Sequence, residues 1–259
     1  MEWNGAGVWA ATEIPSFGRE SLAALAAAEV PAVRLARFGS ATEVRTLCDL
    51  LLAEAVRTHS IEEVTRLGIS QFEQGVRGSK EAYFRQARSL VPCFEGIFAR
   101  SFNPVVRLIA ELRRAGIEAD VMTEPGFGAY WAGNGKMRYG ASPIHVDFAP
   151  QDSAGWAVGE TRVQFAWNVY LDNPGGGGDL HVWERCWSPE DDITHKVEGE
   201  FYYRTDVLRG ARRVDVPVTV GDVVIVNSVL YHAVAEATGR MAFGSFISIF
   251  DVGRFRLWS

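Results

Sequence analysis

Two residue types that bind metals and transfer protons, His145 and Asp147, occur two positions apart in the segment 144–148. The neighbouring residues are β-branched or aromatic, which favours a strand, and residues two apart in a strand project from the same face. The imidazole of His145 and the carboxylate of Asp147 can therefore converge on one point. Because a single pair of this kind also arises by chance as an ordinary hydrogen bond, it indicates chemistry only when a third ligand is found.

His232 is the best candidate for that third ligand. The protein has five histidines, and His232 ends an apolar run that begins at the turn Gly221-Asp222. We expect this run to be a strand that delivers His232 beside the first pair. Two imidazoles and one carboxylate on adjacent strands of a barrel form the facial triad of mononuclear iron(II), which leaves positions open for other molecules. Zinc could bind the same three residues, and a barrel whose histidines are merely hydrogen-bonded in the core is the alternative without a metal.

A cation follows the second histidine. Arg240 comes directly after Thr238-Gly239, at the start of the long apolar strand expected over 241–250. A keto acid that chelates a metal and also carries a distal carboxylate needs a fixed cation for that carboxylate, and the planar guanidinium group of arginine is suited to it. If Arg240 does not have this role, Arg162 and Arg213 are the alternatives.

These motifs together resemble the iron(II) and 2-oxoglutarate dependent oxygenases. The shared pattern is His-x-Asp, a distant His after a Gly-Asp turn, and Thr-Gly-Arg before the next strand. A closer resemblance, over residues 140–250 or so, is to the small bacterial enzymes that hydroxylate or halogenate free amino acids. It rests on Trp167-Asn-Val-Tyr-Leu, the turn from Gly175 to Leu180, Trp183, Trp187-Ser-Pro-Glu and Gly221-Asp-Val-Val.

The resemblance implies three cofactors, which are Fe(II), 2-oxoglutarate as co-substrate and dioxygen (O2). It also implies hydroxylation of an unactivated carbon of a free or minimally derivatised amino acid, with desaturation, cyclisation or halogenation as alternatives. In the halogenases of that group a small residue replaces the carboxylate ligand, so that chloride can take its place. This chain keeps Asp147, which favours hydroxylation.

Further site residues follow from position. We expect His145, Asp147 and His232 to be the catalytic metal ligands and Arg240 to bind the co-substrate. The remaining candidates are Asn168, on the polar face of its strand, for the co-substrate, Phe148 and Arg77 for the substrate, and His181 as an alternative metal ligand.

Two other classes of function remain open from the residues. One is a cupin-like metalloenzyme that uses zinc or iron as a Lewis acid without 2-oxoglutarate. The other is a barrel that binds a small ligand without catalysis, because a fold alone does not imply a function.

The elements that must position these residues divide the chain into two halves. Helical spacing is found over 20–28, 40–58, 79–102 and 104–115, and an extended segment over 30–38. The short β-branched and aromatic runs that predict strands come later, at 118–122, 128–131, 163–171, 178–183, 200–203, 214–218, 222–227 and 241–250, with turns at Asn134-Gly135, Asn173-Pro-Gly and Gly221-Asp222.

This order predicts an α+β protein with a double-stranded β-helix core, a cupin-like jelly roll, buttressed by N-terminal helices. With no linker or repeat visible, we expect a single catalytic domain over 1–259. Residues 1–115 would be mostly helical support, and residues 116–259 the jelly-roll core with the metal site.

The composition of the chain limits the classes of partner that we expect it to bind. The net charge of −6 and scattered basic residues argue against binding of nucleic acid or an anionic membrane, and no stretch is long enough to span a bilayer. The three cysteines are odd in number and far apart, which indicates reduced thiols. We therefore expect a cytoplasmic protein whose partner is a small-molecule substrate, in particular an amino acid.

Overall fold

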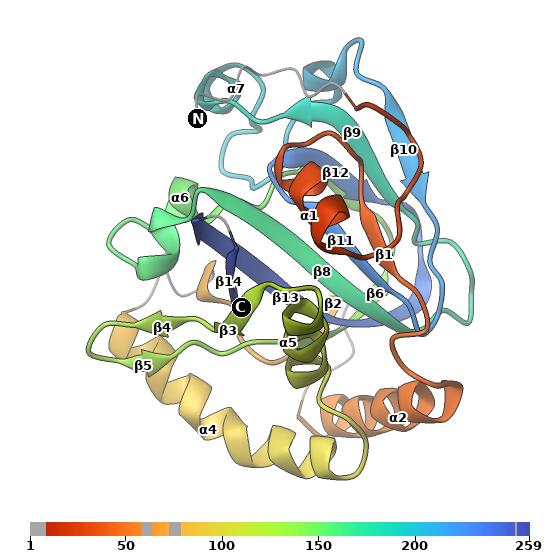
Figure 1. Ribbon diagram of the computed structural model, residues 1–259, viewed down its shortest axis with the longest axis vertical. Helices are drawn as coiled ribbons and strands as arrows, with labels where there is room; N and C mark the ends of the chain where they lie inside the picture. Colours follow the sequence, from red (N-terminus) through yellow and green to blue (C-terminus); the bar gives the residue numbers. More distant parts are fainter. Residues whose placement is uncertain (1–8, 59–63, 73–78, 252) are drawn as a thin grey trace.

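A computed structural model describes residues 9–58, 64–72, 79–251 and 253–259 (Figure 1). Its core consists of two facing antiparallel sheets, with one parallel pair at the edge of the larger sheet. This is the double-stranded β-helix that the sequence predicts, in an α+β chain with N-terminal helices. No helix among the described residues is long and apolar enough to cross a membrane.

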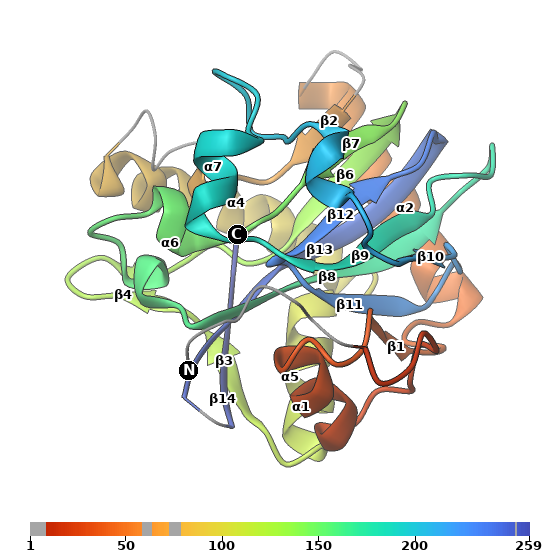
Figure 2. The same ribbon diagram turned by 90° about the horizontal axis from the view of Figure 1, so that it is seen from above.

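The larger sheet has the strand order β1-β11-β8-β13-β14-β3, and β6 extends it by pairing with β13 and β2. Figure 2 shows β8, β11 and β13 running side by side. The bounds of its strands are β1 Val33–Leu35, β2 Val64–Leu67, β3 Glu118–Val121, β6 Asn134–Tyr139, β8 Val163–Asp172, β11 Val223–Asn227, β13 Thr238–Asp251 and β14 Arg254–Trp258.

The smaller sheet has the order β10-β9-β12-β7 and carries both histidines of the predicted triad. Its strands are β7 Ser142–His145, β9 Leu180–Cys186, β10 Arg213–Val216 and β12 Leu230–Val234. A separate two-stranded hairpin joins β4 Thr123–Glu124 to β5 Gly128–Ala129.

The helices cover one face of the larger sheet. In Figure 1, α2, α4 and α5 lie below the strands β8 and β13, and the smaller sheet lies above these two strands. Apolar side chains of these helices share one continuous core with the outer face of the sheet, including Leu51, Phe94 and Leu108. The helices are α1 Arg19–Ala26, α2 Ala41–Thr58, α4 Lys80–Ala99 and α5 Pro104–Arg114, followed after the first strands by the short α6 Ala149–Asp152 and α7 Pro189–Thr194.

Residue alternation along the strands separates the two faces of the larger sheet. On β8, Phe165, Trp167 and Val169 belong to the core under the helices, whereas Ala166 and Tyr170 belong to the core between the sheets. This agrees with the strand period of two residues. The polar positions of β8 therefore face the interior of the barrel, where a ligand can lie.

Three local predictions were wrong. Residues 200–203 form only isolated bridges, of Tyr202 with His145 and Tyr203 with Lys196. Asn134-Gly135 is not a turn but begins β6, because the buried Asn134 amide accepts from Trp131 Nε1 and donates to the carbonyl of Ile69. The run from Gly221 to His232 is not one strand.

The break in that run has structural consequences. β11 belongs to the larger sheet and β12 to the smaller one, so the chain crosses between sheets at Ser228 and Val229. The Ser228 hydroxyl donates to the carbonyl of Asp147 at 2.6 Å, and the Asp147 amide donates to the carbonyl of Ser228 at 2.9 Å. The crossover therefore holds the loop of Asp147 beside the strand of His232.

Candidate metal centre and co-substrate pocket

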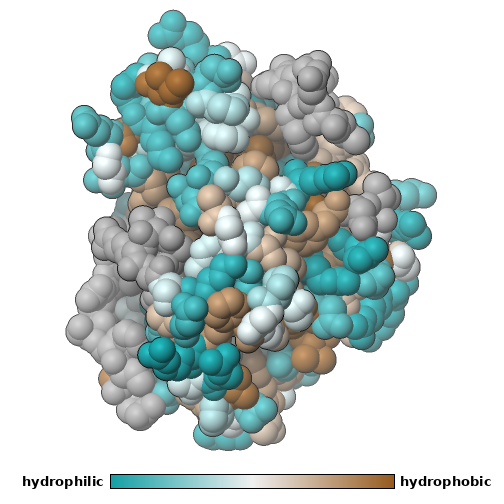
Figure 3. Space-filling view, turned by 90° about the vertical axis from the view of Figure 1, so that its left-hand side faces the viewer, coloured by the Kyte–Doolittle hydropathy of each residue, from teal (hydrophilic) through white to brown (hydrophobic). Residues whose placement is uncertain are grey.

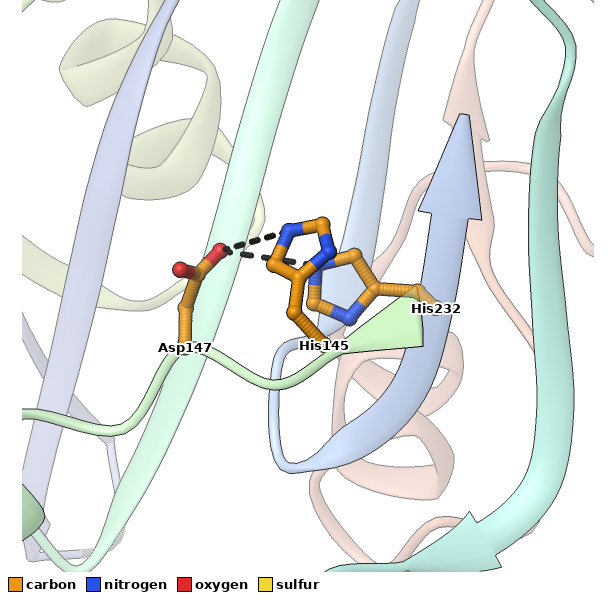
Figure 4. A group of neighbouring side chains, drawn as sticks. All are labelled: His145, Asp147 and His232. Carbon is orange, nitrogen blue, oxygen red and sulfur yellow. Dashed lines mark ion pairs between the residues drawn. The ribbon is translucent and has the colours of Figure 1, made fainter. Parts of the chain in front are cut away.

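The side chains of His145, Asp147 and His232 meet between the two sheets, as Figure 4 shows. His145 ends β7, Asp147 lies in the loop two residues later, and His232 is the direct cross-strand partner of His145 on β12. Asp147 Oδ2 is 3.9 Å from His145 Nε2 and 3.4 Å from His232 Nε2. One ligand atom from each residue lies within 4.8 Å of the others, so a single metal ion could contact all three.

Backbone carbonyls fix both imidazole rings. His145 Nδ1 donates to the carbonyl of Pro143 at 2.7 Å, and His232 Nδ1 donates to the carbonyl of Leu230 at 2.9 Å. A carbonyl can only accept a hydrogen bond, so each Nδ1 carries the proton. Each Nε2 is then left with a lone pair directed at the centre, the tautomer that a metal ligand needs.

The charge states of the triad also suit a divalent metal. Burial, followed by electrostatic repulsion from the neighbouring His232, lowers the pKa of His145 to about 4, so its imidazole is neutral at physiological pH. Burial acts to raise the pKa of Asp147, but its contacts with the imidazoles of His232 and His145 hold this pKa well below its usual value. Two neutral imidazoles and one carboxylate are the donor set of the iron(II) facial triad. The residues present therefore fit the metal.

Arg240 projects from β13 into the barrel interior. Its guanidinium lies over the ring of Tyr170, with Cζ 5.6 Å from the ring centroid, and Nη1 donates to the carbonyl of Gly178 at 2.6 Å. Nε is buried and has no hydrogen-bond partner among the described residues. Burial lowers the pKa of Arg240. A buried guanidinium with an unused donor fits the distal carboxylate of a keto acid.

Gly178 makes this position of Arg240 possible. Its backbone has φ +70°, and a Cβ there would lie 2.9 Å from Cδ of Arg240. The glycine run that the sequence shows at 175–178 therefore gives the arginine room and supplies its carbonyl partner.

Lys136 is a second cation near this site, and the sequence pattern alone did not indicate it. It is opposite Ala242 in the pairing of β6 and β13, and Ala242 belongs to the core between the sheets. Lys136 is half-buried and forms no hydrogen bond or ion pair with another described residue. Burial, followed by the charge of Arg66, lowers its pKa to about 8. The alternation Lys136-Met137-Arg138 would have indicated an inward lysine, had this segment been recognised as a strand.

Asn168 lies on the same face of β8 as Tyr170 and is paired with Gly244 of β13. A Cβ at Gly244 would lie 2.5 Å from Asn168 Oδ1, so the amide lies over this glycine. Asn168, Tyr170, Arg240 and Lys136 thus come from three adjacent strands of one sheet. Their inward face is polar and positively charged.

A cavity of about 730 Å³ adjoins the triad on the side of Asp147. Phe148 lines it, next to Asp147, and its ring centroid is 6.0 Å from that of Trp187. Gln71 also lines it, fully buried, with Oε1 accepting from Ser153 and Nε2 without a partner among the described residues. Arg77, the other predicted substrate residue, lies outside the described residues.

The alternative metal ligand His181 and the alternative cations lie elsewhere. His181 Nδ1 is 2.6 Å from Asp215 Oδ1 across β9 and β10, and it is not part of the triad cluster. Arg162 and Arg213 are exposed on the surface, and Arg213 forms an ion pair with Asp215.

The fold and this site define a class of protein, the iron(II) and 2-oxoglutarate dependent oxygenases. The structure is similar to that of an N-substituted L-amino acid dioxygenase from Burkholderia ambifaria, with a TM-score of 0.65, 14% identity and coverage of 93% of this chain and 91% of the other. The same enzyme in complex with alpha-KG, which is 2-oxoglutarate, gives a TM-score of 0.61 at 15% identity, covering 93% and 90%. At these identities the likeness shows the fold.

The sequence shows the particular family. Residues 74–258 match the family described as carrier-protein-independent halogenase WelO5. The chain is also 30% identical over 192 residues to leucinostatins biosynthesis cluster protein S of Purpureocillium lilacinum, covering 70% of this chain and 77% of that protein. The chain belongs to the WelO5 family. It is a non-heme oxygenase that uses iron(II) and 2-oxoglutarate.

Proposed function

We propose that this oxygenase hydroxylates an unactivated carbon of a free or minimally derivatised amino acid. One oxygen atom of O2 enters the substrate as hydroxyl, and the other enters 2-oxoglutarate, which is oxidatively decarboxylated to succinate and CO2. His145, Asp147 and His232 would hold the iron, with Arg240 on the distal carboxylate of 2-oxoglutarate. The observation that carries the proposal is the carboxylate of Asp147, which points at both histidines.

Asp147 matters because it occupies a position that a halogenase needs for its halide. With two imidazoles, one carboxylate and a chelating 2-oxoglutarate, an octahedral metal has a single position left for O2. A chloride ion would need a further position and would add a negative charge beside a carboxylate whose pKa is already low. Both considerations favour transfer of hydroxyl.

Chlorination of the same substrate is the second candidate, and the family match favours it, because the family is described as a halogenase. The two candidates share metal, co-substrate and cavity. They differ in the group transferred, and the carboxylate of Asp147 supports hydroxylation.

An amino acid substrate is supported by the likeness to the Burkholderia ambifaria enzyme, which is a dioxygenase of N-substituted L-amino acids. The cavity beside Asp147 agrees with a substrate that has both polar and apolar parts. Its walls combine phenylalanine and tryptophan rings with the side chains of Gln71, Gln151 and Lys196.

The chain's own residues have distinct tasks in this proposal. Bound iron with 2-oxoglutarate and O2 supplies an oxidant strong enough to break an unactivated C–H bond. Arg240 and Lys136 neutralise the dianionic co-substrate, and Asn168 is in position to donate a hydrogen bond to it. Phe148 forms an apolar wall next to Asp147, where it can orient the substrate and exclude water.

The test is a reaction of the iron-loaded protein with 2-oxoglutarate, O2 and a library of free and N-substituted amino acids in the presence of chloride. We expect succinate release that depends on the substrate and a product heavier by one oxygen atom. Succinate release with a chlorinated product would instead favour the second candidate. Substrate conversion that does not require 2-oxoglutarate would contradict both.

A further inference from the structure

Two large apolar side chains are exposed at the cavity beside the triad. Phe72 and Phe201 line this cavity together with Asp147, yet 43% of Phe72 and 47% of Phe201 remain accessible to solvent. They project from distant segments of the chain. Exposing two phenylalanine rings at one cavity leaves apolar surface that a ligand can cover.

Phe201 connects this surface to the metal centre. The Tyr202 backbone forms a bridge with His145, and the Tyr203 amide donates to the carbonyl of Ile144 at 2.9 Å, so the segment runs along β7. The Phe201 ring then lies edge-on to the His145 imidazole, with centroids 5.7 Å apart at 78°. The apolar surface therefore begins at a metal ligand and continues outward.

The size of the cavity is a separate observation. Sites for drug-sized ligands have volumes of roughly 300–1,000 Å³, and the 730 Å³ measured here lies well inside that range. The residues that face the co-substrate, Arg240, Lys136 and Asn168, do not line this cavity. Its volume is therefore available to the substrate, and a free amino acid would leave much of it filled with water.

Water in this space would be unfavourable next to a site that must exclude it. Phe72 and Phe201 line the cavity together with Ala149 and Gln151 of α6. Figure 3 shows the face of the molecule that carries α6 and α7, with apolar residues among polar ones. An apolar group that covers both rings would displace this water and gain about 25 cal/mol for each Å² of apolar surface buried.

We propose that the substrate is an amino acid bearing a hydrocarbon substituent of several carbons, which lies between Phe72 and Phe201 and closes the metal site to water. This inference rests on the proposed function for its amino acid part, and on the two rings and the cavity volume for its hydrocarbon part. Phe72 and Phe201 are then the residues that select for chain length.

The experiment measures binding by calorimetry, without O2, to the protein loaded with iron(II) and 2-oxoglutarate. The probes are N-acetyl-, N-butanoyl-, N-hexanoyl- and N-octanoyl-L-leucine. A buried methylene is worth about 0.8 kcal/mol, so affinity should rise by up to about fourfold per methylene until the cavity is filled. In F72A and F201A the increase in affinity with chain length should become much smaller than in the native protein.

The matched control is I193A. Ile193 lies on α7 and is 86% exposed, but it does not line the cavity, so this variant should keep the increase found in the native protein. F201L keeps an apolar side chain and replaces F201A if F201A does not fold. In F201L the increase in affinity with chain length should be intermediate between those of the native protein and F201A. Affinity that is independent of chain length in the native protein, or that rises equally in F72A, F201A and I193A, would overturn the inference.

A second probe series separates this inference from the proposed function. N-alkylacetamides of the same chain lengths lack the amino acid part. If they show the same increase and the leucine part adds no affinity, the hydrocarbon inference stands and the amino acid assignment fails. If the N-acetyl probe binds, and is hydroxylated when O2 is then admitted, while chain length has no effect on affinity, the amino acid assignment stands and the hydrocarbon inference fails. No binding in either series contradicts the inference.

Discussion

His145 and His232 are direct cross-strand partners on β7 and β12, and their ring centroids are 4.3 Å apart. A register shift by one residue would turn one imidazole to the opposite face of the sheet. The metal centre therefore depends on this register. The crossover at Ser228, which bonds to the backbone of Asp147, lies only four residues before His232 and helps to hold it.

The first prediction concerns the metal ligands. Mutating a residue that only hydrogen-bonds to a metal ligand lowers metal affinity by roughly 10- to 100-fold. His145→Ala and His232→Ala each remove a ligand itself, so each should lower the affinity for Fe(II) by more than this. Anaerobic titration with Fe(II) measures this directly. His181→Ala is the matched control, because His181 is bonded to Asp215 on the smaller sheet and should leave iron affinity nearly unchanged. Loss of iron in His181→Ala but not in His232→Ala would show that His232 is not the third ligand.

The second prediction concerns the co-substrate. Arg240→Leu should raise the Kd for 2-oxoglutarate on the order of 10- to 100-fold, because a buried carboxylate loses charge-assisted hydrogen bonds of about 1.5–3 kcal/mol. Lys136→Met should raise it less, since an ammonium is a point charge without the guanidinium fork. Both Kd values are measured by calorimetry on the iron-loaded protein.

Arg213→Leu is the control for these two variants, because Arg213 is exposed and paired with Asp215. Its Kd for 2-oxoglutarate should equal that of the native protein. An unchanged Kd in Arg240→Leu would remove Arg240 from the co-substrate site.

The third prediction concerns Asp147. The native protein should give no chlorinated product even at high chloride concentration, because the carboxylate leaves no position for the halide. Asp147→Gly should lose most hydroxylation, because it removes one ligand and one negative charge. Mass spectrometry of matched reactions with and without chloride checks both. Chlorination by Asp147→Gly is not required, since a misplacement of about 1 Å can cost on the order of a hundredfold in rate.

The fourth prediction concerns acid stability. Hydrogen bonds from Arg107, followed by the Ser40 backbone, lower the pKa of Glu43 from its ordinary 4.5 to about 2. A lowered pKa in the folded state stabilises the protein above the unfolded value of 4.5, and this contribution is lost as the pH falls toward 2. Glu43→Gln should therefore lower the free energy of unfolding at neutral pH by less than about 1 kcal/mol, because Glu43 is partly exposed.

Urea unfolding of the metal-free protein measures this difference. The gap between Glu43→Gln and the native protein should narrow as the pH is lowered through the range between 4.5 and 2. A gap that is constant over this range would mean that the ionised carboxylate of Glu43 contributes nothing to stability.

Much of the site could be predicted from local pattern. The strand period of two put Asn168 on the polar face of β8, and the structure turns that face, with Tyr170, to the barrel interior. It does not account for Asp147, because β7 ends at His145 and Asp147 lies in the loop that follows. The Gly-Arg sequence placed Arg240 at the start of the expected strand over 241–250, and in the structure Arg240 belongs to the first residues of β13. These inferences depend only on residues along one strand, so they can be made without knowing which strands pair with one another.

What could not be predicted depends on contacts between distant segments. The Asn134-Gly135 pair is typical of a turn. It begins a strand here because the Asn134 side chain is hydrogen-bonded to Trp131 and to the carbonyl of Ile69. Lys136 was missed for the same reason, since its strand was not recognised. The exposed ring of Phe201 against His145 results from pairing of its segment with β7, which no local pattern in residues 200–203 indicates.

The central claim is that His145, Asp147 and His232 bind one iron to which 2-oxoglutarate also binds. It is tested most directly by the visible charge-transfer band of iron(II) with bound 2-oxoglutarate, recorded without O2 while Fe(II) is added to the protein with excess 2-oxoglutarate. The account predicts a band that saturates at one iron per chain and is absent in His145→Ala and His232→Ala. A band of native intensity in either variant, or none in the native protein, would contradict it.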